Sequence, residues 1–221
     1  MKAMILAAGH GTRMRPLTNH TPKPLLQVGG KPLIVWHIEK LKKAGFNDIV
    51  INIAWLAEQI PKALGDGSKW GVRIEYSNEQ NEGALETAGG IIKALPLLGE
   101  KRFLVISGDV WCDIDYSSIH LAENDLAQLV VVPNPKHNTT GDFVLNNGRL
   151  QSEGSKNCTF SGIAYYHPAL FKGLPYGKQA IRYVLRDAMD RDKVGGIFHQ
   201  GDWRDIGTPE RLEELDKELK K

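Results

Sequence analysis

Residues near the N-terminus carry the groups needed to bind a polyphosphate. The apolar run Ala3–Ala8 has the length of a β-strand and leads into Gly9-His10-Gly11. Two glycines permit a tight turn in which backbone N–H groups approach an anion closely. A hydroxyl and three cations follow, the last of them held between two prolines: Thr12, Arg13, Arg15 and Lys23. This stretch therefore predicts a cradle for a triphosphate.

Other interpretations of the glycine loop are weaker. A dinucleotide-binding fingerprint requires a third glycine where Met14 stands, which disfavours a dehydrogenase, and the Gly-Lys-Ser/Thr of a P-loop is absent. A lone Gly-x-Gly usually makes only a turn, with the neighbouring arginines in solvent. The longer pattern, with its hydroxyl and its cations, favours phosphate binding over such a turn.

Two aspartates form a candidate metal site. Asp109 follows the apolar run Leu104–Gly108, and Asp205 lies just before a Gly-Thr-Pro helix start. In an open α/β sheet, ligands bind at the carboxyl ends of the strands. Mg²⁺ takes one or two carboxylates together with substrate phosphates. Aspartate is also common in turns and helix caps, so each residue alone leaves that interpretation open.

The pattern Gly-x-Gly-Thr-Arg-x-x-Pro-x-Thr, followed by Pro-Lys-Pro, closely resembles the signature of the sugar-1-phosphate nucleotidyltransferase family. The strand-end Gly-Asp and the Trp-x-Asp-x-Gly-Thr motifs of that family are matched as well. The resemblance runs from Leu6 to about Leu212, and it implies that Asp109 and Asp205 hold a catalytic Mg²⁺. It further implies that Glu79 accepts a base N–H and that the backbone near Ala84 meets a base carbonyl.

The resemblance also assigns roles to individual residues. The implied catalytic residues are Arg13, Lys23 and Asp109. The implied nucleotide-binding residues are Ala7, Ala8, Gly9, Gly11, Thr12, Arg13, Lys23, Glu79 and Ala84. The implied sugar-binding residues include Gly108, Asp142 and Asn157. Glu79 could equally be a solvated loop charge, an interpretation that the sequence leaves open.

The segment Asn134–Phe143 resembles the corresponding segment of bacterial uridylyltransferases that act on N-acetylmuramate α-1-phosphate. That sugar carries an ionised lactyl carboxylate, so a specific site needs an extra cation or backbone N–H donors. Arg204, beside Asp205, is the first candidate and Lys156 the second, although Arg204 could instead point into solvent. The Glu-Lys-Pro tripeptide with which many members grip the sugar phosphate is missing. Lys156 and Arg149 are the candidates to replace it.

Alternating apolar and amphipathic segments predict an α/β fold with a doubly wound, mostly parallel (Rossmann-like) sheet flanked by helices. After Leu126, turn residues such as Asn146-Asn147-Gly148 indicate hairpins and hence a mixed sheet. We expect one domain over 1–221, with residues 1–110 as a nucleotide-binding half and 111–221 as a sugar-binding half. The sequence Thr208-Pro209-Glu210 predicts an N-cap opening a C-terminal helix.

Bulk properties exclude several classes of protein. A net charge of +2 over 221 residues gives no reason to expect nucleic acid or a membrane surface as partner. No apolar run has the length of a membrane span, so the expected location is cytoplasmic. Cys112 and Cys158 show no metal-type spacing, and the histidines form no zinc motif. We expect a monomer or small homo-oligomer.

The predicted reaction joins a nucleoside triphosphate to a sugar 1-phosphate, giving a nucleotide-diphospho-sugar and pyrophosphate. UTP with N-acetylmuramate 1-phosphate is the preferred pair, which implies a role in peptidoglycan recycling. A thymidylyl-, uridylyl- or guanylyltransferase for glucose or mannose 1-phosphate is the alternative within the class. A non-catalytic nucleotide-sugar sensor or regulatory subunit is the alternative outside it. Loss of Arg13, Lys23 or an aspartate would favour that last alternative, and none of them is lost.

Overall fold

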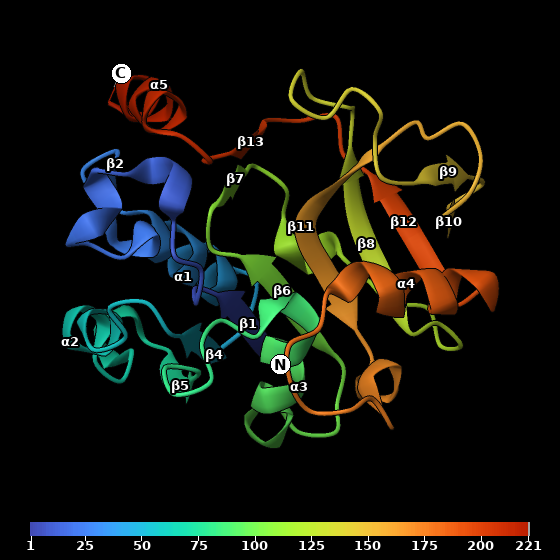
Figure 1. Cartoon of the computed structure of the whole chain (residues 1–221), viewed down its shortest axis with the longest axis horizontal. Helices are drawn as coiled ribbons and strands as arrows, with labels where there is room; N and C mark the ends of the chain where they lie inside the picture. The colour runs from blue at the N-terminus through green and yellow to red at the C-terminus, as the bar shows by residue number, and fades with distance from the viewer. Residues whose placement is uncertain (221) are drawn as a thin grey trace.

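The computed structural model describes residues 1–220 and is built on a nine-stranded sheet with the order β5-β4-β1-β6-β11-β8-β12-β10-β9 (Figure 1). That sheet contains β1 (Lys2–Leu6), β4 (Asp48–Ile53), β5 (Arg73–Asn78), β6 (Phe103–Ser107), β8 (Ala127–Val132), β9 (Val144–Asn146), β10 (Arg149–Gln151), β11 (Thr159–Tyr166) and β12 (Val194–Phe198). Two short ladders pair β2 (Gln27–Val28) with β3 (Lys31–Pro32) and β7 (Val110–Cys112) with β13 (Trp203–Asp205). The α-helices are α1 (Leu33–Lys43), α2 (Gln59–Leu64), α3 (Glu86–Leu98), α4 (Ile181–Asp190) and α5 (Pro209–Leu219).

The strands from the N-terminal half of the chain run parallel. Strand β1 pairs with β4 and with β6, so that Leu6 lies opposite both Asn52 and Ser107, and β5 continues the parallel set beyond β4. Since parallel strands place their carboxyl ends at one edge, the loops that follow β1, β4 and β6 meet there. The glycine-rich loop and Asp109 therefore share one edge of the sheet.

The remaining strands make the sheet mixed. Strand β11 is antiparallel to both β6 and β8, β12 is parallel to β8, and β9 and β10 form an antiparallel hairpin at the far edge. The turn of that hairpin lies at Asn147-Gly148, and both residues have positive φ angles, as such a turn requires. The predicted α/β class, with a mixed sheet flanked by helices, is confirmed.

Helices cover both faces of the sheet. Ala3 and Ile5 of β1 belong to one apolar core, together with buried residues of α1 and α2. Met4, which points the other way, belongs to a second core with α3 and α4. This alternation of side chains along a strand is what sandwiches a parallel sheet between helices. None of the helices between residues 1 and 220 has the length and apolar character needed to cross a bilayer.

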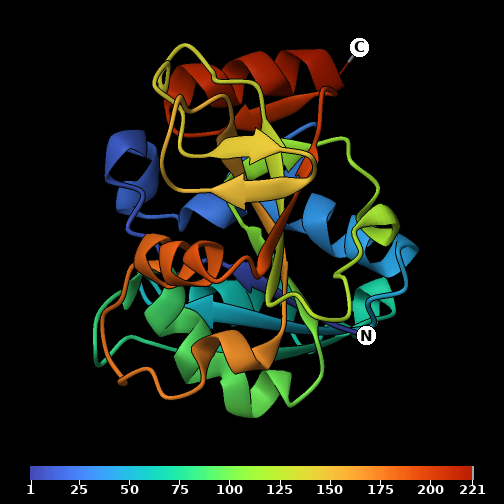
Figure 2. The ribbon, with the colours of Figure 1, turned by 90° about the vertical axis from the view of Figure 1, so that its right-hand side faces the viewer.

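Helix α5 packs apart from these two layers. Leu212 and Leu215 join a third apolar cluster with Met14, Leu33 and Ile206, so the C-terminal helix covers the segment that follows the glycine loop. Figure 2 shows α5 (red) at the opposite end of the molecule from α3 (green). The predicted helix start is confirmed, since Thr208 stands at the N-cap with extended backbone, although its side chain makes no capping hydrogen bond.

His37 of α1 is a polar side chain within an apolar layer. It is only 2% exposed, and its Nδ1 lies 3.1 Å from the Tyr116 hydroxyl. Among residues 1–220 no group hydrogen-bonds its Nε2. Burial, helped by the charge of Lys40, lowers the pKa of His37 from 6.5 to about 4. The folded protein therefore keeps this imidazole neutral.

This lowered pKa predicts a loss of stability in acid. As pH falls from 6.5 towards about 4, the unfolded chain protonates the imidazole while the folded chain does not. The stabilisation is complete above pH 6.5 and falls below it, by up to about 3 kcal/mol. We expect the free energy of unfolding in urea to depend less on pH over this window in His37→Gln than in the unmutated chain. Exposed His120 supplies the control: His120→Gln should keep the original slope, and an unchanged slope in His37→Gln would contradict the assignment.

Candidate active site

A cavity of about 370 Å³ opens at the carboxyl edge of β1, β4 and β6. Its walls are formed by the loop after β1, the segment before α3 and the end of β6. The sequence-predicted residues that line it are Ala7, Ala8, Gly9, Gly11, Thr12, Arg13, Lys23, Glu79, Ala84, Gly108 and Asp109. The structure thus brings the whole predicted nucleotide-binding set into one cavity.

Gly11 sets the shape of the glycine loop. Its φ of +61° lies in the left-handed region that other residues rarely adopt, and a Cβ there would lie 2.9 Å from Thr18 Cγ2. The Gly11 carbonyl accepts hydrogen bonds from the Thr18 hydroxyl and from the Met14 backbone N–H, both at 2.8 Å. Thr12 and Arg13 consequently face the cavity, whereas Arg15 is exposed and is not among the lining residues.

Lys23 and Asp109 form an ion pair in the wall of the cavity. The Lys23 ammonium donates to Asp109 Oδ2 at 2.7 Å, and the two side chains are 9% and 39% exposed. Lys23 opens a 3₁₀ turn, Lys23–Leu25, with Pro22 before it and Pro24 within it, so the backbone beneath the ammonium is stiff. The pair links the segment after the glycine loop to the carboxyl end of β6.

The short β7–β13 ladder brings Asp205 next to Asp109. Asp205 lies opposite Val110 in that ladder, and the Ile206 backbone N–H donates to the Asp109 carbonyl at 2.9 Å. The Asp205 carboxylate accepts a hydrogen bond from Arg211 at 2.9 Å. The carboxylates of Asp109 and Asp205 thus lie on adjacent backbone segments, and each contacts a cationic side chain. Such a pair of oxygen donors fits Mg²⁺, which combines few carboxylates with phosphate oxygens and water.

Gly207 connects the second aspartate to the cavity. A Cβ on this glycine would lie 3.1 Å from both Asp205 carboxylate oxygens and 3.2 Å from Arg13 Nη1. Gly207 itself lines the cavity. The Asp205 carboxylate and the Arg13 guanidinium therefore border the same glycine of the cavity wall.

A buried polar chain holds the wall at the base-recognition segment. Glu79 is fully buried, accepting hydrogen bonds from Asn52 Nδ2 at 2.7 Å and from the Leu85 backbone N–H at 2.9 Å. Asn52 Oδ1 in turn accepts from the Ala7 backbone N–H at 2.8 Å. A Cβ on Gly90 would lie 2.7 Å from Glu79 Oε1, so only glycine fits at this position. Sequence reasoning missed Asn52, although an asparagine inside a β-branched strand was a usable signal.

Glu86 marks the start of α3 with an unusual backbone. Its φ is +60°, rare for a residue with a side chain, and it lines the cavity together with Thr87. The segment before α4 fixes this end of the helix, because the Gln179 carbonyl accepts the Ala88 and Gly89 backbone N–H groups. Left-handed non-glycine residues concentrate at ligand sites, which supports a binding role for this wall.

The residues predicted to bind the sugar lie outside this cavity, apart from Gly108. Asp142 accepts hydrogen bonds from Asn138 Nδ2 and from the Phe160 backbone N–H. Asn157 is bonded through its amide to both backbone groups of Leu145. These side chains hold the hairpin region together in this conformation.

A second cavity of about 530 Å³ borders Asp205. It is formed by the loop after β8, by β13 and by the first turns of α5. Its basic lining residues are Lys136, His137, Arg204 and Arg211. Arg204 is paired with Asp202 at 2.9 Å and with Glu218 at 2.6 Å. The same contacts raise the pKa of Arg204 further above its usual value, so it stays charged.

Comparison with known proteins identifies the family of the chain. The family model described as "Nucleotidyl transferase" matches residues 2–143. The chain is 53% identical, over 97% of its own length and 96% of the other, to the N-acetylmuramate alpha-1-phosphate uridylyltransferase of Neisseria meningitidis serogroup B. The chain therefore belongs to the nucleotidyl transferase family.

More distant relatives agree with this assignment. A mannose-1-phosphate guanylyltransferase catalytic subunit beta from Xenopus tropicalis is 30% identical over 95% of this chain, which spans 62% of that protein. The solved structure of a protein assigned as a glucose-1-phosphate thymidylyltransferase from Bacillus anthracis superposes with a TM-score of 0.86. That likeness covers 100% of this chain and 95% of the other at 24% identity, and it supports the fold alone.

The buried Glu79 carboxylate predicts a defect in nucleotide affinity when it is changed. In Glu79→Gln one of the two acceptor oxygens becomes an NH₂ group. The Asn52 amide and the Leu85 N–H can then no longer each donate to a separate oxygen, so the hydrogen bonds that hold this wall should weaken. We expect weaker nucleotide binding, by about tenfold for a lost charge-assisted hydrogen bond of about 1.5 kcal/mol. Equilibrium binding of UTP measures the effect. Exposed Glu82 lies in the same loop, and Glu82→Gln should bind as the original chain does; equal losses in both variants would refute this role.

Proposed function

We propose that the chain is a sugar-1-phosphate nucleotidyltransferase that releases pyrophosphate. The carrying observation is the cavity in which the glycine loop, Lys23 and Asp109 meet, in a chain that resembles a uridylyltransferase along nearly its whole length. Arg13, Lys23, Asp109 and Asp205 are all retained, which argues against a non-catalytic sensor. We further propose one domain, with residues 1–110 mainly binding the nucleotide and 111–221 mainly binding the sugar.

The proposed reaction is an in-line displacement at the α-phosphorus of the nucleotide. A sugar phosphate has its second pKa near ~6, so its attacking oxygen is already ionised at neutral pH and no general base is required. The bond to the sugar-phosphate oxygen forms as the bond to the pyrophosphate bridging oxygen breaks. Arg13 and Lys23 act by aligning two polyanions and by stabilising charge that shifts towards pyrophosphate.

Asp109 and Asp205 are the proposed ligands of Mg²⁺. Bound there, the ion would neutralise phosphate charge and orient the α-phosphate. The protein's own contribution is to hold two carboxylates on neighbouring segments and to keep cations beside them. Lys23 and Arg211 compensate those carboxylates when no ion is bound, which lowers the cost of bringing them together.

UTP and N-acetylmuramate 1-phosphate are the proposed substrates, with Glu79 and the Ala84 backbone on the base side. The reaction would return a cell-wall sugar to its nucleotide form, as peptidoglycan recycling requires. UTP is a cytoplasmic metabolite, so the proposed reaction is cytoplasmic. Glucose or mannose 1-phosphate with another nucleotide is the rival pair, favoured by the 30% identical guanylyltransferase relative.

We propose that the second cavity supplies the cations for a lactyl carboxylate. Arg204 and Lys136 both line it beside Asp205. Arg204 already faces two carboxylates, whereas Lys136 forms no ion pair within the described residues 1–220. We propose that both residues bind the sugar, and that Lys136 contributes more than Arg204 to the electrostatic attraction of the lactyl carboxylate. Asp142 and Asn157 would then bind the sugar ring after a change in their present hydrogen bonds.

Replacing either catalytic-site aspartate by asparagine should abolish most turnover. In Asp109→Asn and Asp205→Asn the new amide would keep a carbonyl oxygen towards Lys23 or Arg211, so the fold should survive while the charge that attracts Mg²⁺ is lost. We expect kcat, measured by pyrophosphate release, to fall by at least about a hundredfold, the scale of losing an electrostatic catalytic group. A single cooperative unfolding transition in each variant would establish the fold, and near-normal turnover in Asp205→Asn would remove that residue from the site.

A panel of nucleoside triphosphates against sugar 1-phosphates tests the substrate assignment. With UTP, N-acetylmuramate 1-phosphate should exceed N-acetylglucosamine 1-phosphate in kcat/KM by about one to two powers of ten, from one charged hydrogen bond. Lys136→Ala should erase more of this preference than Arg204→Ala. Lys172→Ala, on a distant exposed segment, should leave it intact. Equal rates on the two sugars, or a preference for glucose or mannose 1-phosphate, would overturn the muramate assignment and leave the class standing.

A further inference from the structure

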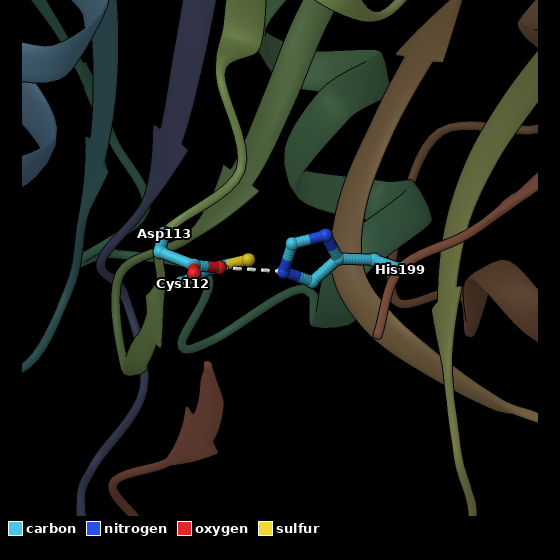
Figure 3. A group of neighbouring side chains, drawn as sticks. All are labelled: Cys112, Asp113 and His199. Atoms are coloured by element: carbon cyan, nitrogen blue, oxygen red, sulfur yellow. Dashed lines mark hydrogen bonds and ion pairs between the residues drawn. The ribbon is translucent and has the colours of Figure 1, made fainter. Parts of the chain in front are cut away.

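A cluster of side chains with three different donor atoms lies outside both cavities. Cys112, Asp113 and His199 each offer one ligand atom, and these atoms all lie within 4.8 Å of one another. Figure 3 shows the carboxylate and the sulfur facing the imidazole, with a dashed line joining Asp113 to the ring. The His199 Nε2 and Asp113 Oδ1 atoms are 2.7 Å apart.

The backbone fixes the three positions. Cys112 ends β7, and the next residue, Asp113, donates its N–H to the Asp202 carbonyl at 2.9 Å. His199 directly follows β12 and donates its N–H to the Val131 carbonyl at 2.8 Å. The turn at Gly201 packs so closely that a Cβ would lie 2.5 Å from Asp113 Oδ1. The donor atoms are therefore held together by main-chain contacts of three separate segments.

The protonation state of the Cys112 sulfur depends on whether a cation is bound. Its side chain is 2% exposed and forms no disulfide. Burial raises the pKa of this thiol to about 11, while the Ile114 backbone N–H and the Lys40 charge act in the opposite direction by favouring the thiolate. Without a cation the group stays a neutral thiol at pH 7. A bound metal ion displaces such a proton outright.

We propose that Cys112 Sγ, a carboxylate oxygen of Asp113 and His199 Nε2 bind a zinc-like divalent ion, with water as the fourth ligand. One sulfur, one nitrogen and one oxygen donor match Zn²⁺ and not Mg²⁺, which requires oxygen ligands. With bonds of about 2.0–2.3 Å, tetrahedral ligand atoms lie about 3.5 Å apart, within reach of the observed cluster. The half-exposed Asp113 side chain leaves a path for solvent.

The charge and proton balance of the proposed site is simple. The Cys112 thiol releases its proton to solvent, and His199 binds as the neutral tautomer that carries its proton on Nδ1. The thiolate and the carboxylate together neutralise the two positive charges of the ion. The nearby Lys40 ammonium, which donates to the Cys112 carbonyl, opposes the ion but also favours the thiolate. No oxidation or reduction is involved.

The role of such an ion would be to fix strand β13. Trp203 lies opposite Cys112, and Asp205 lies opposite Val110 in the same ladder. An ion that joins β7 to the residue after β12 would hold the turn that leads into β13. It would therefore stabilise the segment carrying Asp205 without contacting substrate.

Cobalt substitution tests the site directly. Untagged, chelator-treated protein titrated with Co²⁺ should develop a thiolate-to-cobalt charge-transfer band and the visible bands of tetrahedral cobalt at one equivalent. The charge-transfer band should vanish in Cys112→Ser, and His199→Gln should bind Co²⁺ more than about a hundredfold more weakly, a larger loss than a residue that only orients a ligand would cause. Cys158→Ser, which alters the other buried thiol, should retain both features. No band in the unmutated chain, or a band that disappears in Cys158→Ser, would overturn the proposal.

Thermal unfolding separates this ion from the proposed catalytic one. Zn²⁺ should raise the melting temperature of the unmutated chain and of Asp109→Asn, but not that of Cys112→Ser. Mg²⁺ without nucleotide should not reproduce the shift. A zinc-dependent shift that persists in Cys112→Ser would place the ion elsewhere and contradict the proposal, whatever the outcome for the transferase activity.

Discussion

The ion pair between Lys23 and Asp109 is the contact on which the candidate site depends. Lys23 is nearly buried, and removing its partner would leave an uncompensated charge, which is costly in a protein interior. The pair also joins two segments that meet only because β1 and β6 are parallel neighbours. The buried Lys23 ammonium beside the half-exposed Asp109 carboxylate can bind phosphate without a rearrangement of the neighbouring side chains. The proposed reaction therefore uses an ion pair that already stabilises the fold.

The β7–β13 ladder extends this arrangement to the C-terminal part of the chain. Three residue pairs tie β13 to the strand that directly follows Asp109. Helix α5 then packs through Leu212 and Leu215 over the segment behind the glycine loop. In the proposed scheme, oxygen donors sit at one end of this ladder and the Cys112 sulfur at the other. Mg²⁺ would bind at the end with the oxygen donors and the zinc-like ion at the end with the sulfur, because the two ions prefer different donor atoms. Only the three residue pairs of the ladder would lie between the two sites.

Much of the nucleotide half could be predicted from sequence because its signals are local. Apolar strands β1, β4 and β6 and amphipathic helix α1 show clear periodicity, and Gly11 appears where a positive φ is needed. Parallel pairing then forces the strand-end loops together, so predicted residues from Ala7 to Asp109 line one cavity. The boundaries were less accurate. Strand β1 ends at Leu6 instead of Ala8, since the glycine loop begins before the apolar composition changes.

The rest depends on contacts that no local pattern encodes. Strands β7 and β13 have three residues each, too few for a periodic signal, and their pairing joins positions about ninety residues apart. That pairing brings Cys112 to His199, two residues that the spacing of cysteines and histidines gave no reason to connect. Asn52 was missed for a different reason. It lies within β4, whose β-branched residues were read only as a strand signal, so its side chain was given no role. A buried amide must satisfy its hydrogen-bonding groups, and satisfying them here links the Ala7 backbone to Glu79. Asn52 thereby links the backbone of the glycine loop to the wall that contains Glu79.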